Sequence, residues 1–252
     1  MSKPQLTKDI WLASLRADGD AFRAVLNSGT PLDAPVPSCP GWSVGDLAWH
    51  LSLVYSYVTG HVARGLLDQP EPRRTDPLPE GVDAATAWTD AFTELVATLD
   101  AVEPELPAWN FAPQAKKASF WHRRMAHETA IHRWDAQMAG GLAGPIEARL
   151  ASDNVTEVLD TWLPSGRRGG PADRAGMIAL HATDVDQVWY VRLRGAGIAL
   201  LDTDTLLDSD DHHERATASG SASDLALALW GRVPFDTLLV SGDATLLRGL
   251  LA

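Results

Sequence analysis

The spacing of hydrophobic residues predicts that the first 140 residues of this 252-residue chain form four helices. In each of four segments the apolar positions recur every three or four residues, which places them on one face of a helix. The predicted helices span residues 6–28, 43–67, 83–101 and 119–140. In the first helix the expected buried stripe is Ile10, Ala13, Ala17, Ala21 and Val25.

The ends of these helices carry recognisable signals. Residues 30–41 hold four prolines and are expected to form a loop. Ser43 then serves as an N-cap, with Asp46 in the first turn of the second helix. A Pro-rich connection at 69–81 is longer than a tight turn requires, so it predicts either a crossover or a loop that covers a site. Gly140 and Gly141 end the fourth helix.

From residue 145 the pattern changes to short β-like runs mixed with helices. The expected strands lie at 177–181, 188–193, 198–201, 215–218 and 238–240, and the expected helices at 146–163, 223–230 and 244–251. We therefore expect a four-helix bundle at residues 1–143 and a small α+β domain at residues 144–252. The boundary is predicted near Gly141–Pro145.

Composition and charge argue against several classes of protein, including nucleic-acid-binding, secreted and membrane proteins. The chain is 45% hydrophobic and 21% charged, as in globular proteins, and its formal net charge of −12 argues against an extended nucleic-acid interface. Cys39 is the single cysteine, so no intrachain disulfide can form. The N-terminus lacks an apolar signal region, and no apolar run reaches the roughly 20 residues of a membrane span. We expect a cytoplasmic protein without nucleic-acid or membrane partners; the sequence leaves its oligomeric state open.

Candidate chemistry gathers on the second and fourth helices. Glu128, His132 and Asp135 fall at i, i+4 and i+7 on one helical face, and His50 borders the apolar stripe of the second helix. Together His50, Glu128 and His132 could hold one divalent metal and leave a coordination position open, as catalytic sites do. Asp135 is placed to accept the other ring N–H of His132. Spacing alone leaves two alternatives open, a solvated Glu–His pair and a core histidine at position 50.

Three segments resemble one known family. They are residues 39–51 (Cys-Pro-Gly-Trp-Ser-Val-Gly-Asp-Leu-Ala-Trp-His-Leu), residues 127–136 (His-Glu-Thr-Ala-Ile-His-Arg-Trp-Asp-Ala), and residues 220–232 followed by Gly242-Asp243. All three are similar to segments of the mycothiol-dependent maleylpyruvate isomerase family, which lies within the DinB-like bundle superfamily. The resemblance implies a DinB-like four-helix bundle in which His50, Glu128 and His132 hold a divalent metal, usually zinc. It also implies mycothiol as the thiol cosubstrate.

The resemblance leaves the substrate open. The leading hypothesis is a thiol S-transferase that adds mycothiol to an electrophilic small molecule. Transfer and isomerisation would both use a metal-bound thiol, because such a thiol loses its proton more easily than a free one. The first alternative is cis–trans isomerisation of a dicarboxylate such as maleylpyruvate, which would require arginines around the metal. A bulky apolar electrophile would instead require tryptophan walls, and the ten tryptophans favour transfer. A non-catalytic binding or regulatory protein is the third hypothesis. The expected pocket residues are Trp49, Trp121 and Arg124, with Trp88 as a further candidate wall.

Other polar residues receive structural interpretations. Cys39 lacks a local histidine partner and is expected to pack. His122 and His127 point away from Glu128 on the helix and are expected at the surface or beside the ligands, and His61 lies too far along its helix to reach the same ion. The acidic and histidine-containing run at 208–214 is interpreted as a solvated loop. Arg123, Arg124 and Arg133 could meet an anionic substrate, or could equally pair with acidic residues of their own helix.

Overall fold

A computed structural model describes residues 6–141, 143–167, 169–195, 197–201 and 214–252. The chain divides into two compact units, Met1–Gly144 and Pro145–Ala252. Among the helices of the described residues, none is both long enough and apolar enough to cross a membrane.

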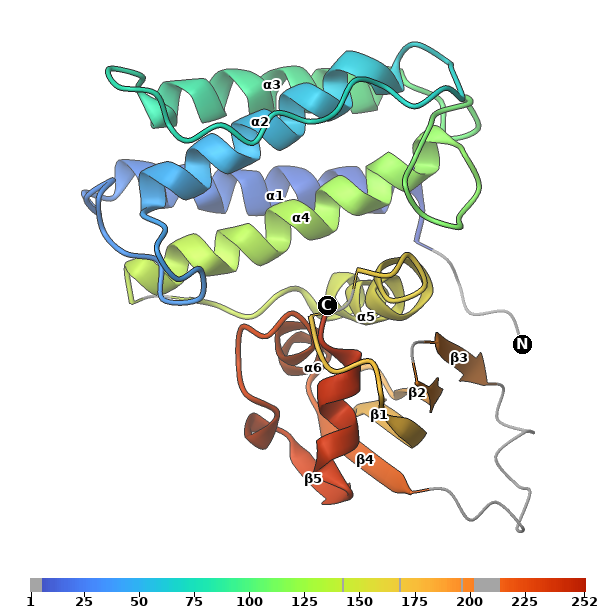
Figure 1. Ribbon diagram of the computed structural model, residues 1–252. Coiled ribbons are helices and arrows are strands. Elements are labelled where there is room, and N and C mark those ends of the chain that lie inside the picture. The colour runs from blue at the N-terminus through green and yellow to red at the C-terminus, as the bar shows by residue number, and fades with distance from the viewer. Residues whose placement is uncertain (1–5, 142, 168, 196, 202–213) are drawn as a thin grey trace. The chain divides into compact units, whose positions relative to one another are not determined.

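The first unit is a bundle of four helices in two layers (Figure 1). The helices are α1 (Lys8–Asn27), α2 (Val44–Val62), α3 (Ala84–Ala101) and α4 (Ala118–Ala139). Helix α2 packs mainly on α3, and α1 packs mainly on α4. The four predicted helices are confirmed, but α2 ends five residues earlier than predicted. The chain leaves the helix near Gly65, whose φ of 67° is a left-handed conformation that glycine adopts without strain.

The predicted buried stripe of α1 is only partly correct: Val25 is buried, Ile10 and Ala21 are half-buried, and Ala13 and Ala17 are exposed. The buried face consists of Trp11, Leu12, Leu15, Gly19, Phe22 and Val25. Large side chains remove far more apolar surface from water than alanines do, so they decide which face turns inward. At Gly19 there is no room for a side chain, because a Cβ there would overlap the ring of Phe92 on α3.

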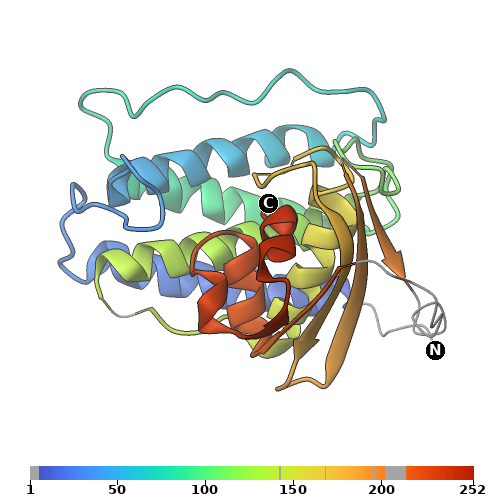
Figure 2. The same cartoon turned by 60° about the horizontal axis from the view of Figure 1, so that its bottom comes forward.

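The connection between α2 and α3 returns along the length of α2, as Figures 1 and 2 both show. It is therefore the predicted crossover, and α3 starts at the same end of the bundle as α2. The indole nitrogen of Trp49 on α2 donates a hydrogen bond of 2.9 Å to the carbonyl oxygen of Asp76. We call residues 68–78 of this connection the strap.

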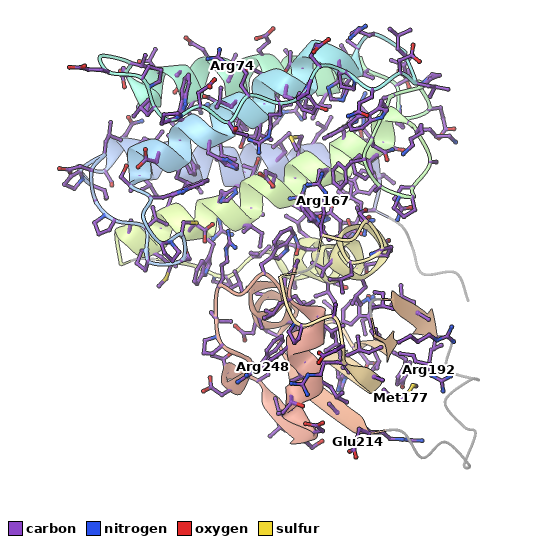
Figure 3. The ribbon with its side chains drawn as sticks, in the orientation of Figure 1. Arg74, Arg167, Met177, Arg192, Glu214 and Arg248 are labelled. Atoms are coloured by element: carbon purple, nitrogen blue, oxygen red, sulfur yellow. The ribbon has the colours of Figure 1, made fainter. Side chains whose placement is uncertain are left out.

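The second unit is built on a five-stranded sheet. Its strands are β1 (Ala175–Ala182), β2 (Gln187–Arg194), β3 (Gly197–Leu201), β4 (Arg215–Gly220) and β5 (Leu239–Gly242), in the spatial order β3-β2-β1-β4-β5. Strand β1 pairs in parallel with β4, and the other pairs are antiparallel. Arg192 of β2 lies opposite Met177 of β1, and its Nε is 3.3 Å from the Met177 sulfur (Figure 3).

Several helical segments accompany the sheet. Helix α5 (Ala148–Glu157) continues into a π-helical turn at Val158–Trp162, and α6 (Ala222–Leu229) follows β4. The closing helix, Ala244–Leu250, is a 3₁₀ helix, as is the short turn Phe235–Thr237. The predicted fold class is confirmed: a four-helix unit is followed by an α+β unit, and each expected strand is present.

Candidate metal centre

Helix α4 supplies two of the candidate ligands and is unusually buried, with 16 of its 22 residues inside the protein. Polar groups inside a protein must find partners, since an unpaired buried charge costs several kcal/mol. The polar residues of α4 are accordingly paired with specific neighbours. Glu128 and His132, one turn apart, meet His50 of α2.

The three ligand atoms converge. His50 Nε2 lies 3.3 Å from Glu128 Oε1, and His132 Nε2 lies 3.5 Å from the same oxygen. All three candidate ligand atoms lie within 4.8 Å of one another. The side chains of His50, Glu128 and His132 remain 20%, 16% and 10% exposed, so the group is accessible at one side.

These distances fit a metal ion. In a tetrahedral zinc site with bonds of about 2.0–2.1 Å, neighbouring ligand atoms lie about 3.3–3.4 Å apart. Two imidazoles and a carboxylate are also the donors that borderline divalent ions prefer. The residues present therefore fit a single divalent cation held by His50, Glu128 and His132.

Arg124 positions Glu128 from behind. Its Nη2 donates a hydrogen bond of 2.7 Å to Glu128 Oε2, and its side chain is only 3% exposed. Burial by itself raises the pKa of Glu128, but hydrogen bonds from the two histidines and the charge of Arg124 outweigh burial and hold the pKa well below its usual value. Of the two interpretations left open for Arg124, pairing on its own helix is the observed one. Arg133 instead pairs with Asp18 of α1, at 2.8 Å.

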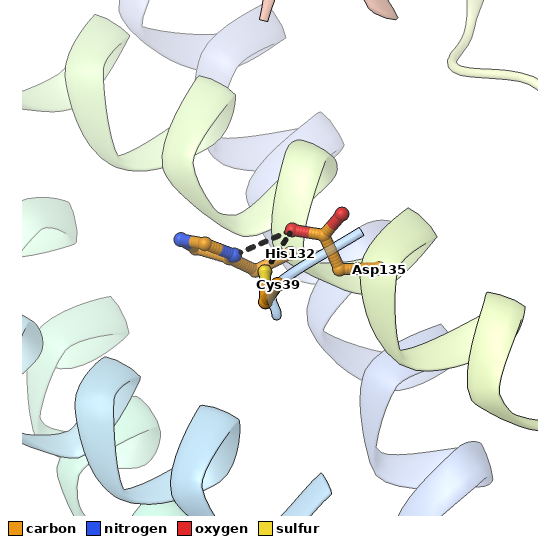
Figure 4. Close-up of side chains that lie close together, drawn as sticks. All are labelled: Cys39, His132 and Asp135. Carbon is orange, nitrogen blue, oxygen red and sulfur yellow. Dashed lines mark hydrogen bonds and ion pairs between the residues drawn. The ribbon is translucent and has the colours of Figure 1, made fainter. Parts of the chain in front are cut away.

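Asp135 orients His132, as Figure 4 shows. Its Oδ2 accepts a hydrogen bond of 2.8 Å from His132 Nδ1, which leaves Nε2 to face Glu128. Ser38 Oγ donates to the other oxygen of Asp135 at 2.6 Å. Burial alone lowers the pKa of His132, but its hydrogen bonds, with that to Asp135 the strongest, raise the pKa well above its usual value.

Cys39 also belongs to this cluster, although the sequence shows no histidine partner close to it along the chain. Its Sγ lies 3.5 Å from Asp135 Oδ2, and Cys39, His132 and Asp135 form a second group whose ligand atoms lie within 4.8 Å of one another. The contact joins residues 96 positions apart, so local spacing could not reveal it.

A cavity of about 450 Å³ opens beside His50. Trp42, Trp49 and Arg73 line it, with the strap along one side. The Trp42 and His50 rings lie 4.9 Å apart. Burial lowers the pKa of His50, and the charges of His132 and Arg73 lower it further. The sequence predicted Trp49 as a pocket residue but not Trp42 or Arg73. Trp42 lies within the segment that carries the family resemblance, whereas nothing in the sequence distinguished Arg73.

Trp121 and Trp88 lie elsewhere. Trp121 is 3% exposed, donates to the carbonyl oxygen of Trp109 at 2.7 Å, and packs edge-on against His61. Trp88 is fully buried and stacks on Phe22 and Phe92 in the bundle core. Neither residue lines the cavity beside His50.

The remaining histidines of the bundle are buried. His122 and His127 have no exposed surface, so a surface position is wrong for both. The two ring nitrogens of His122 lie 2.9 and 2.8 Å from the carbonyl oxygens of Ala118 and Leu99. Most residues of α4 are buried, which explains the error, because a histidine that points away from Glu128 on this helix still lies inside the protein. Of the run 208–214, residues 208–213 lie outside the described part of the chain.

Comparison with known proteins places both units in one family. The family model described as "Mycothiol maleylpyruvate isomerase N-terminal domain" matches residues 12–137, and the model of the "MDMPI C-terminal domain" matches residues 149–249. No curated protein matches the chain significantly in sequence.

Two solved structures share the fold. One is a crystal structure of the mycothiol-dependent maleylpyruvate isomerase (TM-score 0.61), and the other is a variant of that enzyme with one histidine replaced by alanine (TM-score 0.60). Each is 14% identical to this chain, and each match covers 94% of this chain and 93% of the other. The two family models together span both units, so this chain belongs to the mycothiol maleylpyruvate isomerase family of enzymes.

Proposed function

We propose that this chain is a metal-dependent enzyme that activates mycothiol for addition to an electrophilic small molecule. The observation that carries the proposal is the convergence of His50, Glu128 and His132 beside a cavity of about 450 Å³. Zinc is the ion we propose, because two imidazoles and one carboxylate are a common catalytic zinc set. The thiol is proposed from the family to which the chain belongs.

The protein groups have distinct tasks in this proposal. Arg124 holds Glu128 Oε2, so that Oε1 faces the two imidazoles. Asp135 holds the Nδ1 side of His132 and thereby directs Nε2 inward. A divalent cation held by His50, Glu128 and His132 would supply Lewis acidity, which favours the nucleophilic thiolate form of a thiol. The cavity beside His50 brings the electrophile to the sulfur and removes much of the entropic cost of their meeting.

The net reaction depends on the fate of the carbon–sulfur bond. In transfer, the sulfur forms a bond to the electrophilic carbon, a leaving group departs with the displaced electron pair, and the thioether is released. In isomerisation, the sulfur bonds to one carbon of a cis double bond while the π electron pair moves to the other carbon, and the remaining single bond then rotates. The electron pair forms the double bond again as the carbon–sulfur bond breaks and the thiolate leaves. The thiol is consumed in the first case and recovered in the second.

Isomerisation of a cis-unsaturated dicarboxylate is the second candidate, and one observation favours it. The cavity beside His50 contains Arg73, whereas Trp121 and Trp88 do not line it. Trp42 and Trp49 are therefore the tryptophans that support transfer to a bulky apolar electrophile. A non-catalytic role is disfavoured, because a partly buried carboxylate between two imidazoles adds no stability to a helical bundle.

Metal analysis and a thiol-dependence assay together test the proposal. The purified protein should contain about one divalent ion per chain, and turnover of an electrophile panel should require mycothiol. Each reaction is run with mycothiol, with another small thiol and with none. Cys39→Ala should remain active under the same conditions, because the nucleophile comes from the cosubstrate. Equal rates with and without thiol would contradict the proposal.

A further inference from the structure

A second cavity, of about 500 Å³, adjoins the first along α2. The two share Trp49, Leu53 and Arg73 in their walls, so they are neighbouring parts of one groove between α2 and the strap. The first part contains His50. The second part continues toward the end of α2, where His61 and Arg64 line it.

The second cavity is rich in arginine, although the chain as a whole carries a formal net charge of −12. Arg64, Arg73 and Arg74 all line it, and among its described lining residues Glu71 is the only acidic one. Arg74 is already paired, since its Nε donates to Asp76 Oδ2 at 2.8 Å. Within the described residues, neither Arg64 nor Arg73 forms a side-chain hydrogen bond or ion pair with another residue.

We propose that Arg64 and Arg73 bind the acidic group, a carboxylate or a phosphate, of an elongated substrate whose reactive end lies at His50. This inference rests on the proposed function, because it assigns the rest of the groove to the same substrate. Arg73 lies at the junction of the two cavities and Arg64 in the second, so the acidic group is held away from the reacting carbon.

The chemistry of the groove supports this assignment. A guanidinium presents several N–H donors in a planar fork that matches a carboxylate or a phosphate. Arg73 is half-buried, so its guanidinium has lost part of its hydration, and no other residue in the described part of the chain forms a hydrogen bond or ion pair with it. A bound anion would supply hydrogen-bond acceptors in place of the lost water. Trp49 and Tyr57 supply apolar surface along the wall for the carbon chain between the two ends.

Binding of a simple diacid by isothermal titration calorimetry tests the proposal. The probe is glutarate, and its uncharged diamide, glutaramide, is the matched control. We expect glutarate to bind the metal-loaded protein at least about tenfold more tightly than glutaramide does. Arg73→Met should weaken glutarate binding about tenfold and Arg64→Met, at an exposed position, about threefold. Arg74→Met is the control variant, and it should change binding less than twofold because Arg74 already pairs with Asp76.

The same titration on metal-depleted protein separates the arginine site from the metal. Glutarate affinity should persist without metal, because neither arginine is a metal ligand. Equal affinity for glutarate and glutaramide would overturn the proposal, as would binding that requires the metal and is unchanged in Arg73→Met. Thiol-dependent turnover is measured on the same samples. Retained turnover alongside a failed titration would reject only the anion site, whereas thiol-independent turnover would reject the proposed function itself.

Discussion

The bundle carries histidines at two places along α2 and α4, and the two places differ in chemistry. At one, His50 and His132 direct ring nitrogens at the carboxylate of Glu128. At the other, His61 and His122 direct ring nitrogens at backbone carbonyl oxygens, including that of Tyr57 at 2.7 Å from His61 Nδ1. The first pair faces one carboxylate, whereas the second pair faces backbone carbonyl groups.

This contrast shows that burial and residue type alone do not identify a site histidine. His132 and His61 are similarly buried, at 8% and 5% exposure. Their partners decide the outcome. Hydrogen bonds to carboxylates raise the pKa of His132 despite burial, whereas burial lowers the pKa of His61. The candidate metal centre is therefore distinguished by which groups the imidazoles face.

Removing a ligand histidine should have the largest effect. His132→Ala and His50→Ala should each lower metal affinity at least about a hundredfold, because two ligands rarely retain an ion that three hold. Metal content measured by plasma mass spectrometry after dialysis checks this expectation. His181→Ala, on β1 of the second unit, is the control and should keep its metal. Full metal retention in both ligand variants would refute the assignment.

Removing a core histidine should damage the fold and spare the metal. His122 is fully buried and contacts two backbone carbonyl groups, so His122→Ala should lower the free energy of unfolding by about 2–4 kcal/mol. Urea unfolding of the variant and its parent measures the loss, and metal analysis of the folded fraction measures occupancy. If His122→Ala were as stable as the parent but had lost its metal, the distinction between ligand histidines and core histidines would be wrong.

Asp135→Asn should produce a smaller loss at the metal centre. An amide can no longer accept hydrogen bonds with a full negative charge, so the orientation of His132 is held less firmly. Metal affinity should fall about 10–100-fold while the fold stays intact. Competition with a chelator measures the affinity, and circular dichroism checks the fold. Unchanged affinity would mean that Asp135 only anchors the loop containing Ser38 and Cys39.

Acidification should lower the free energy of unfolding by a modest amount, because His61 is buried. The pKa of His61 is lowered in the folded protein, mainly by burial, so below about pH 6.5 the unfolded chain binds a proton that the folded chain does not. Stability should therefore decrease as the pH falls through this range. The decrease should be shallower in His61→Gln, measured by urea unfolding at several pH values. An identical slope in the variant and the parent would show that His61 does not contribute.

Much of the fold could be predicted from the sequence because its signals are local. Ser43 is the N-cap of α2 as expected and forms a capping box with Asp46, and each predicted strand appears in the sheet. The error in α1 arose where the pattern offered two faces, one of alanines and one of larger residues such as Trp11 and Phe22. The face with the larger residues packs against α3 and α4, because burying more apolar surface lowers the free energy of the folded state more.

Part of the candidate site could also be predicted from local sequence patterns. Glu128, His132 and Asp135 are joined by helical periodicity, which a sequence displays directly. Cys39 meets Asp135 across 96 positions, and Arg73 reaches the cavity beside His50 from the strap. No local sequence pattern predicts these two contacts, because the path of each loop depends on the packing of the whole bundle.

Local sequence signals specify the helices, the strands, the order of the two units and the helical face that carries Glu128 and His132. Backbone hydrogen bonding, capping and hydrophobic periodicity act over a few residues, so they can be read along the chain. Only the tertiary structure decides three further features. They are which histidines face a carboxylate, which tryptophans line a cavity and where the strap places Arg73. They depend on packing between segments that are distant in the chain, and close packing selects one arrangement from many that the local pattern permits.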